Sequence, residues 1–153
     1  MKSCFLFGHK DAPEDILDRL SKAIIRHHLE LSIHTFVVGH YGAFDHAAMV
    51  AAQKVKTMYS DAHFLLLTPY HPSVRSIELP EGFDSTLYLE GMEESIPKLA
   101  IIRANQLMIQ RVNSIICYVN HPGNSRNLLG YANKRAEKES LYIENLATRE
   151  KYF

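Results

Sequence analysis

The stretch that most constrains this chain lies between Thr35 and Lys56, where a short apolar run leads through two glycines into a helical pattern. Residues 36–38 are typical of a buried strand, and Gly39 and Gly42 permit a turn that larger residues resist. Apolar side chains then recur at helical spacing. A strand that enters a helix in this way directs backbone N–H groups at one point, where the helix dipole adds positive potential. The pattern predicts either an anion site, often for phosphate, or a plain turn that needs small residues.

Apolar strands and amphipathic helices alternate along the whole sequence. Strands are predicted at 3–7, 35–38, 63–67, 83–89, 114–119 and 141–146, and helices from a cap at Asp11 to about 28 and then at about 43–59, 95–112 and 124–138. Strands that are apolar throughout are typical of a mostly parallel sheet covered by helices on both faces. We therefore predict an α/β fold, a single Rossmann-like domain over residues 1–153 with about five to six strands. Residues 71–85 are predicted to form a loop or flap, and the charged residues 147–153 a frayed tail.

Composition narrows the class of protein. The formal net charge is zero, with 17 basic and 17 acidic residues, so we expect no direct contact with nucleic acid or an anionic membrane. No apolar run reaches the length of a bilayer span, and the start MKSCFLFGHK lacks the features of a signal peptide. We therefore expect a cytoplasmic protein. Cys4 and Cys117 lie in apolar runs without metal-type spacing, so we expect them to be reduced and buried.

In an open parallel sheet, ligands bind beyond the carboxyl ends of the strands. The segments that follow the predicted strands are rich in glycine, amide, hydroxyl and imidazole groups: Gly8-His9-Lys10, residues 39–45, Pro69-Tyr70-His71 and residues 121–125. Such an edge suits a phosphorylated ligand. Asp45 either caps the first turn of its helix or accepts hydrogen bonds from ribose hydroxyls. Tyr70 either stacks on a base or is a structural aromatic at a loop corner.

The long helix predicted at 95–112 carries a basic residue on an apolar stripe. Arg103 aligns with Ile96, Ala100 and Leu107, and Asn105 aligns with Ile101, Met108 and Val112. A buried guanidinium needs a carboxylate, carbonyl groups or a ligand phosphate to offset its desolvation. The alternatives are a phosphate or carboxylate clamp, an internal pair with Asp45 or Glu93, and a side chain that reaches solvent.

Nine histidines are many for a chain of 153 residues, and several fall near the predicted carboxyl edge: His9, His40, His46, His71 and His121. Neutral imidazoles are common zinc ligands. However, no pair has the His-x-x-x-His spacing of a helical site, and no Cys or Glu completes a recognisable set. We therefore predict no metal site and expect these histidines to bond to a ligand or to the backbone.

The motifs follow one another in a characteristic order. Gly8-His9-Lys10 comes first, then Gly39-x-x-Gly42-x-Phe44-Asp45-x-Ala47-Ala48, then Pro69-Tyr70, then Arg103-Ala104-Asn105-Gln106-x-Met108, and finally Gly123-Asn124-Ser125 before Tyr131-Ala132. In this order, from about Phe5 to Lys138, they resemble the SLOG superfamily. More narrowly, they are similar to its small bacterial branch that includes the YpsA-like proteins.

The resemblance implies a Rossmann-like domain that binds a nucleotide or a nucleotide-derived ligand. Relatives in the superfamily include the DNA-processing protein DprA, sensor modules of proposed bacterial conflict systems, and the Lonely Guy phosphoribohydrolases. It implies ligand contacts from Gly8, His9, Lys10, Gly39, Gly42, Phe44, Asp45, Pro69, Tyr70, Arg103, Asn105, Gly123, Asn124 and Ser125. No cofactor is implied beyond this nucleotide-like ligand.

The chain also departs from the family pattern. Lys10 stands where the branch usually has arginine, so the charge is kept but a bidentate phosphate grip is lost. The phosphoribohydrolases carry Pro-Gly-Gly-x-Gly-Thr-x-x-Glu, and here Gly130 replaces their catalytic glutamate. We therefore do not expect this chain to have the hydrolase activity of the phosphoribohydrolases.

Three hypotheses follow from the sequence. The first is a nucleotide-binding or sensing protein. The second is a hydrolase acting on the glycosidic or phosphate bond of a nucleotide, with Asp45 or His46 as general acid–base. The third is an interaction subunit of a DNA-processing or regulatory assembly. A homo-oligomer is compatible with each of them.

Overall fold

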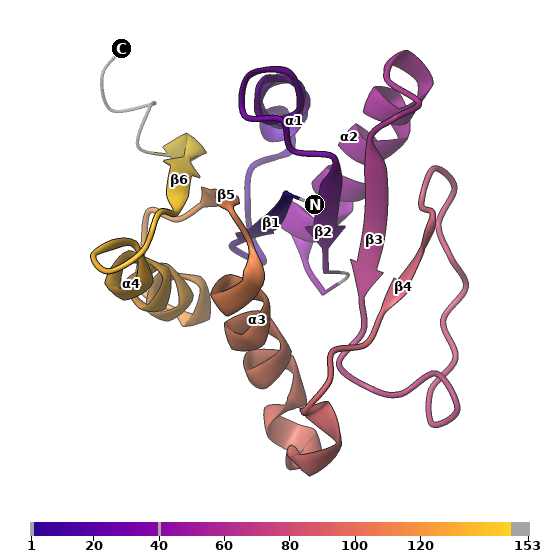
Figure 1. The fold of residues 1–153 in the computed structure, drawn as a ribbon, viewed down its shortest axis with the longest axis vertical. Helices are drawn as coiled ribbons and strands as arrows, with labels where there is room; N and C mark the ends of the chain where they lie inside the picture. Colours follow the sequence, from indigo (N-terminus) through magenta and orange to yellow (C-terminus); the bar gives the residue numbers. More distant parts are fainter. Residues whose placement is uncertain (1, 40, 148–153) are drawn as a thin grey trace.

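The computed structural model describes residues 2–39 and 41–147, which form one parallel sheet with helices on both faces (Figure 1). The six strands lie in the order β4-β3-β2-β1-β5-β6, and every pair is parallel. Their bounds are Ser3–Gly8 (β1), Thr35–Val38 (β2), His63–Leu67 (β3), Ser85–Leu87 (β4), Ser114–Tyr118 (β5) and Tyr142–Asn145 (β6). The predicted Rossmann-like α/β fold is confirmed.

The helices divide between the two faces of the sheet. Their bounds are Leu17–Glu30 (α1), Ala43–Met58 (α2), Ala100–Arg111 (α3) and Asn124–Ala136 (α4), with short 3-10 turns at Glu14–Ile16 (η1), Met92–Glu94 (η2) and Pro97–Leu99 (η3). Side chains of α1 and α2 share one hydrophobic core, and those of α3 and α4 share the other. In Figure 1, α1 and α2 lie above the sheet and α3 and α4 below it.

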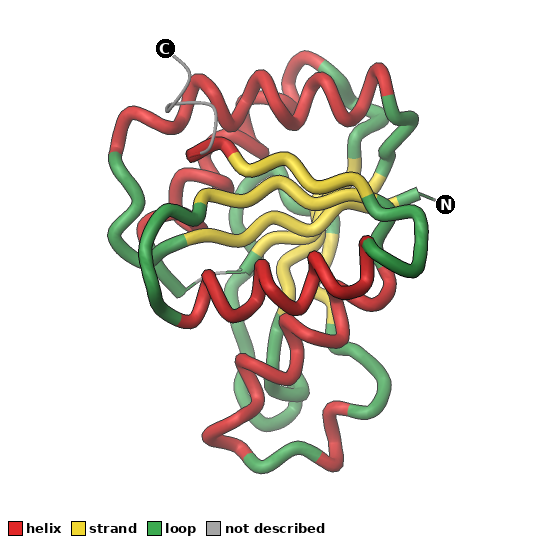
Figure 2. Tube along the Cα trace, turned by 90° about the vertical axis from the view of Figure 1, so that its left-hand side faces the viewer, coloured by secondary structure: helices red, strands yellow, loops and turns green. Residues whose placement is uncertain are grey.

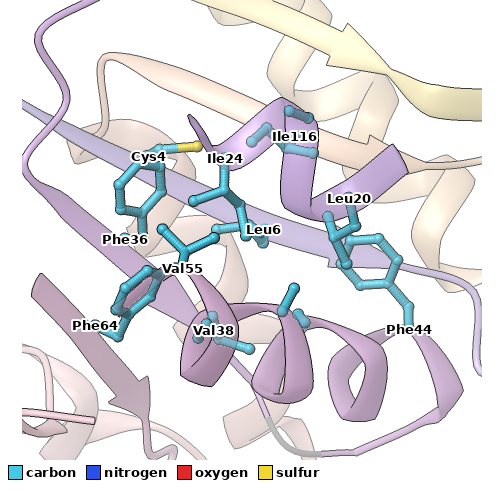
Figure 3. Packing of buried hydrophobic residues seen from close by; sticks show 14 of the residues in the cluster. Cys4, Leu6, Leu20, Ile24, Phe36, Val38, Phe44, Val55, Phe64 and Ile116 are labelled. Carbon is cyan, nitrogen blue, oxygen red and sulfur yellow. The ribbon is translucent and has the colours of Figure 1, made fainter. Parts of the chain in front are cut away.

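Alternate residues of the strands supply the two cores, as the two-residue period of a strand requires. Along β1, Cys4 and Leu6 point towards α1 and α2, while Phe5 and Phe7 point towards α3 and α4. Figure 3 shows the first of these cores, where Leu6 packs among Ile24, Val55 and other buried side chains. Both cysteines are free thiols and buried, as predicted.

Two helix starts differ from the prediction. The segment from Ser95 was expected to be helical, but η3 at Pro97–Leu99 precedes α3, which begins only at Ala100. Asp11 was expected to cap the first helix. Instead η1 begins at Glu14 after Pro13, with no side-chain cap, and the Asp11 carboxylate bonds to His121. A capping side chain belongs to the residue just before the helix and accepts the N–H of the second or third helical residue. Here that position is Pro13, and Asp11 lies two residues before it.

A long connection and the 3-10 turns extend beyond the sheet. Residues 68–84 connect β3 to β4 without a helix or strand. The segment with η2 and η3 projects away from the sheet at the bottom of Figures 1 and 2. Of the tail predicted to fray, only Ala147 is described, and it is buried. Residues 148–153 and His40 lie outside the described residues.

Candidate functional site

A pocket of about 800 Å³ lies at the carboxyl edge of the sheet. The strand order reverses between β1 and β5, because the chain proceeds from β1 through β4 on one side and then crosses to β5 on the other. This switch point is where open α/β sheets bind ligands. The segments after β1, β2 and β5 and one side of α3 all line the pocket. Its volume falls in the range of small-molecule sites, about 300–1,000 Å³.

The turn between β2 and α2 forms one wall. Gly39, Tyr41, Gly42 and Asp45 line the pocket there. The backbone N–H of Ala43 donates to the Lys10 carbonyl oxygen at 3.0 Å, which holds this turn against the segment after β1. The Tyr41 N–H donates to Asp45 Oδ2 at 3.0 Å. A methyl group at Gly39 would lie 2.8 Å from the same oxygen, so a glycine there leaves room for the carboxylate.

Asp45 is the most perturbed acid on this wall. Its burial raises its pKa from 3.8 to about 6, and the Tyr41 N–H offsets part of that rise. A carboxyl group that titrates near neutrality can accept hydrogen bonds when ionised and donate a proton when neutral. Asp45 therefore offers the pocket either a ribose acceptor or an acid–base group.

The turn between β5 and α4 forms the facing wall. Gly123, Asn124 and Ser125 line the pocket at the point where α4 begins. Gly123 has φ of 146°, a backbone conformation that side-chain-bearing residues rarely adopt. Neither α2 nor α4 has a side-chain cap at its N-cap residue, Gly42 or Gly123. The Ala43 N–H, the first of α2, is already bonded to the Lys10 carbonyl oxygen, but the other early N–H groups of both helices still need an acceptor, which an anion in the pocket can supply.

Two histidines meet at the pocket rim, as the sequence suggested. The rings of His9 and His121 stack with centroids 3.5 Å apart. His9 Nε2 accepts the backbone N–H groups of Asn120 and His121, at 2.9 and 3.3 Å. Burial lowers the pKa of His9, and the neighbouring His121 lowers it further. His9 is thus a neutral ring that fixes the turn after β5.

The surroundings of His121 shift its pKa in the opposite direction from that of His9. Its Nδ1 donates to the Pro122 carbonyl oxygen at 2.9 Å, and its Nε2 lies 3.1 Å from Asp11 Oδ1. The Pro122 carbonyl and then the Asp11 carboxylate raise the pKa of His121. The rim therefore carries an imidazole that gains positive charge more readily than an isolated histidine.

The side of α3 that faces the pocket was only partly predicted. Asn105 lines the pocket as expected, together with Ile101, Ile102 and Lys98. Lys98 was missed, although it stands three and seven residues before Ile101 and Asn105 and so shares their side of a helix. That spacing was the signal that could have found it. Lys98 and Lys10 supply the cationic ammonium groups of the pocket lining.

The structure brings together most of the predicted site residues. Those that line the pocket are Gly8, His9, Lys10, Gly39, Gly42, Asp45, Pro69, Asn105, Gly123, Asn124 and Ser125. They come from segments far apart along the chain. The predicted meeting of the two glycine turns at one hollow is therefore present, with Lys10 at that hollow.

Arg103 does not line this pocket, and of the alternatives that the sequence left open the structure bears out the side chain that reaches solvent. It is exposed and lines a separate depression with Glu94, Ser95 and Leu99. α3 packs on the sheet through Ala100, Ala104, Leu107 and Met108. Arg103 sits beside this stripe and, being two residues from Asn105, faces away from the pocket.

Phe44 and Tyr70 are placed apart from the pocket lining. Phe44 is fully buried in the core near Leu20 (Figure 3). A Cβ at Gly8 would lie 2.6 Å from the Phe44 ring, so the two residues fit against each other. The Tyr70 hydroxyl donates to the Pro97 carbonyl oxygen at 3.2 Å, and Arg75 lies over its ring at 4.3 Å. Both aromatics have protein partners in these positions.

The remaining histidines do not join the pocket. The His46 side chain is exposed on α2, and the backbone N–H of His46 donates to the Gly42 carbonyl oxygen at 2.9 Å. His71 is exposed in the 68–84 connection, where its Nδ1 is 2.7 Å from the Ser73 hydroxyl. Of the two weak catalytic candidates, the pocket therefore keeps Asp45 and not His46.

Comparisons with known proteins add no assignment. No family model matches the chain, and a search of curated proteins found no matching relative. Within residues 2–39 and 41–147, no helix has both the length and the apolar character needed to cross a bilayer.

Proposed function

We propose that the protein binds a nucleotide or a nucleotide-derived phosphate compound in the pocket at the carboxyl edge of the sheet. The observation that carries this proposal is the convergence of two glycine turns, each leading into a helix without a side-chain cap, on one cavity. Helix starts of this kind bind phosphate through backbone N–H groups. The resemblance to the SLOG superfamily, which implies a domain that binds nucleotides or nucleotide-derived ligands, points the same way.

The other pocket groups suit the remainder of such a ligand. Lys10 and Lys98 supply positive charge for phosphate oxygens. Asp45 offers a carboxylate to ribose hydroxyls, as acidic residues do in dinucleotide folds. Leu67, Ile101 and Ile102 provide apolar surface for a base.

The proposal is tested by calorimetric titration with AMP, ADP-ribose, NAD and cyclic nucleotides, with adenosine as the ligand that lacks phosphate. We expect at least one phosphorylated compound to bind more tightly than adenosine. If the phosphorylated compounds bind no better than adenosine, the proposal is wrong.

A charge change at the start of α4 makes the test specific. Asn124→Asp is nearly isosteric and favourable to the helix dipole, so it should leave the fold intact. It places a negative charge at the proposed phosphate position and should weaken binding at least about tenfold, which corresponds to about 1.4 kcal/mol. Asn133→Asp makes the same chemical change near the other end of α4, where Asn133 is exposed. This control should bind like the unmodified protein.

The raised pKa of Asp45, about 6, favours a hydrolase as the second candidate function. A general acid–base works best with a pKa near the operating pH. Chromatography of nucleoside monophosphates after incubation would reveal free base or nucleoside. Turnover that Asp45→Asn abolishes and His46→Ala leaves unchanged would support this candidate, and absence of product across the panel would exclude it for these substrates.

A further inference from the structure

A second cluster of histidine and carboxylate groups lies at the amino edge of the sheet, opposite the pocket. His28 is in the last turn of α1, His34 directly precedes β2, and Asp61 lies between α2 and β3. One potential ligand atom from each residue lies within 4.8 Å of the other two. The rings of His28 and His34 meet edge to face with centroids 5.2 Å apart. We call these three residues the amino-edge cluster.

His28 is oriented as metal-binding histidines are. Its Nδ1 donates to the Ile33 carbonyl oxygen at 2.7 Å, which fixes the ring. A neutral imidazole with its proton on Nδ1 carries its lone pair on Nε2. That atom lies 3.1 Å from Asp61 Oδ1. Because a carboxylate oxygen only accepts, Nε2 carries a proton towards Asp61 when no ion is bound. A metal ion would replace that proton between Nε2 and Oδ1, while the backbone carbonyl on Nδ1 keeps the ring oriented, as it does for metal-binding histidines.

The burial of the three residues also suits a bound ion. His28 is only 4% exposed, so its imidazole is held in place by its surroundings. His34 is half-buried and Asp61 is exposed, which leaves the outer side of the cluster open to solvent. An ion could enter from solvent, and water could complete its coordination.

The cluster of His9, Asp11 and His121 at the pocket rim has similar spacing but different chemistry. There the Nε2 lone pair of the buried His9 already accepts two backbone N–H groups. The proton of the neutral ring is then on Nδ1, which has no lone pair to offer. The hydrogen bonds therefore favour the amino-edge cluster, and not the rim cluster, as a ligand set.

We infer that His28, His34 and Asp61 bind a divalent transition-metal ion of the Zn²⁺ type through two imidazole nitrogens and one carboxylate oxygen. Two histidines and one carboxylate form a common ligand set for Zn²⁺ and related first-row ions. The ion would tie the end of α1 to the starts of β2 and β3. Because it lies at the edge opposite the pocket, we expect it to stabilise the fold and not to contact the pocket ligand.

The test uses the full chain after removal of metal with a chelator. Zn²⁺ is titrated in competition with a chromophoric chelator, and Co²⁺ is followed by its visible absorption bands. His34→Gln and Asp61→Asn remove one ligand each at positions that are not fully buried, so the variants should fold. His63→Gln is the matched control, because His63 is an exposed histidine at the same edge, where its Nδ1 lies 3.6 Å from Asp84 Oδ1.

We expect one equivalent of Zn²⁺ or Co²⁺ per chain, with binding at least about tenfold weaker in His34→Gln and Asp61→Asn. The control should bind as the unmodified protein does. Zn²⁺ should also raise the Tm of the unmodified protein more than that of the two variants, since an ion that binds only the folded state stabilises it. If no stoichiometric ion binds, or if His121→Gln abolishes binding and the two amino-edge variants do not, the inference is overturned.

Discussion

Glu144 and Asp45 are two carboxylates that folding largely removes from water, and the structure surrounds them differently. Glu144, on β6, is 6% exposed; its Oε1 lies 3.0 Å from His27 Nε2, and it also forms an ion pair with Arg26. Asp45, on α2, accepts the Tyr41 N–H and faces the pocket. The first carboxylate is paired with basic side chains inside the protein, whereas the second faces a cavity that a ligand can fill.

The surroundings of Glu144 show why paired groups alone do not define a site. His27 Nδ1 lies 2.9 Å from the Ser114 hydroxyl, so serine, histidine and glutamate are linked in the order of a nucleophilic triad. However, Ser114 and His27 are each 1% exposed, and neither lines the pocket. No substrate could reach the hydroxyl. The comparison teaches that access to a cavity, and not the linkage of residue types, separates the candidate site from the structural network.

The largest effect that tests this comparison is expected from Glu144→Gln. Loss of the charge leaves Arg26 without its ionic partner and disturbs the bond to His27. Breaking a buried ion pair by removing one partner costs about 3–5 kcal/mol. Because the Arg26 side chain is 34% exposed and can reach water, we expect the free energy of unfolding, measured with urea, to fall by the lower end of this range, about 3 kcal/mol.

Glu139→Gln is the matched control. Glu139 also pairs with an arginine, Arg135, but its side chain is exposed. Exposed pairs of this kind contribute about 0–1 kcal/mol. Equal losses in Glu144→Gln and Glu139→Gln would contradict the assignment of Glu144 to a buried structural network.

The second prediction is that Asp45→Asn raises the free energy of unfolding at neutral pH, whereas Glu144→Gln lowers it. Burial raises the pKa of Asp45 from 3.8 to about 6, so the folded state holds its proton more strongly than the unfolded state. Stability is therefore lost as the pH rises through that window, and at neutral pH the ionised group destabilises the fold. Asparagine keeps an acceptor for the Tyr41 N–H without the charge. The variant should gain up to about 3 kcal/mol at pH 7, at about 1.4 kcal/mol for each pKa unit.

The pH dependence supplies the control for this gain. Well below the unfolded pKa of 3.8 both states carry a neutral carboxyl group, so the difference between variant and unmodified protein should shrink as the pH falls towards 3.8 and vanish below it. Urea unfolding at a series of pH values measures this difference. A loss of stability at pH 7 would show that Asp45, like Glu144, is satisfied within the protein.

The fold was predictable because its signals are local. The strands predicted at 3–7 and 35–38 are apolar runs that stop at a glycine, and the one at 63–67 stops at Thr68-Pro69. All three form as predicted apart from one added residue in β1, Gly8. The start of α3 could not be predicted in this way. The change from 3-10 turns to an α-helix at Ala100 depends on how this segment projects from the sheet. Propensity alone does not record that tertiary context.

The candidate site was predictable only where sequence order determines position. Residues that follow parallel strands must gather at one edge, which placed Lys10, Gly39 and Gly123 correctly. The prediction for Arg103 failed because Arg103 is two residues from Asn105 on α3 and therefore faces another side of the helix. Which side of α3 faces the pocket is decided by the packing of Ala104 against the sheet, which the sequence does not show. The amino-edge cluster was invisible for a related reason, because its residues precede strands or end a helix and meet only after folding.

A smaller effect, on ligand affinity, is expected from Lys98→Ala, and Arg103→Ala is its comparison. Lys98 lines the pocket and Arg103 does not, although the sequence favoured Arg103. We expect Lys98→Ala to weaken binding of a phosphorylated ligand about tenfold, since a charge-assisted hydrogen bond contributes about 1.5–3 kcal/mol. Arg103→Ala should leave the affinity unchanged. Calorimetric titration distinguishes them, and a loss in Arg103→Ala alone would restore the sequence-based prediction.

The smallest effect is expected at the pocket rim, from Asp11→Asn. The Pro122 carbonyl and the Asp11 carboxylate raise the pKa of His121 above its usual 6.5, so their stabilising contribution is present below pH 6.5 and is lost as the pH rises through the folded pKa. Removing the Asp11 charge should lower the pKa of His121, measured by NMR titration of its ring protons, with little change in Tm because both side chains are exposed. Asp18→Asn, which removes an exposed carboxylate paired with Lys22, should leave that titration unchanged. A large drop in Tm for Asp11→Asn would place this pair with Glu144 among the structural contacts, and the contrast between the buried network and the pocket would then fail at the rim.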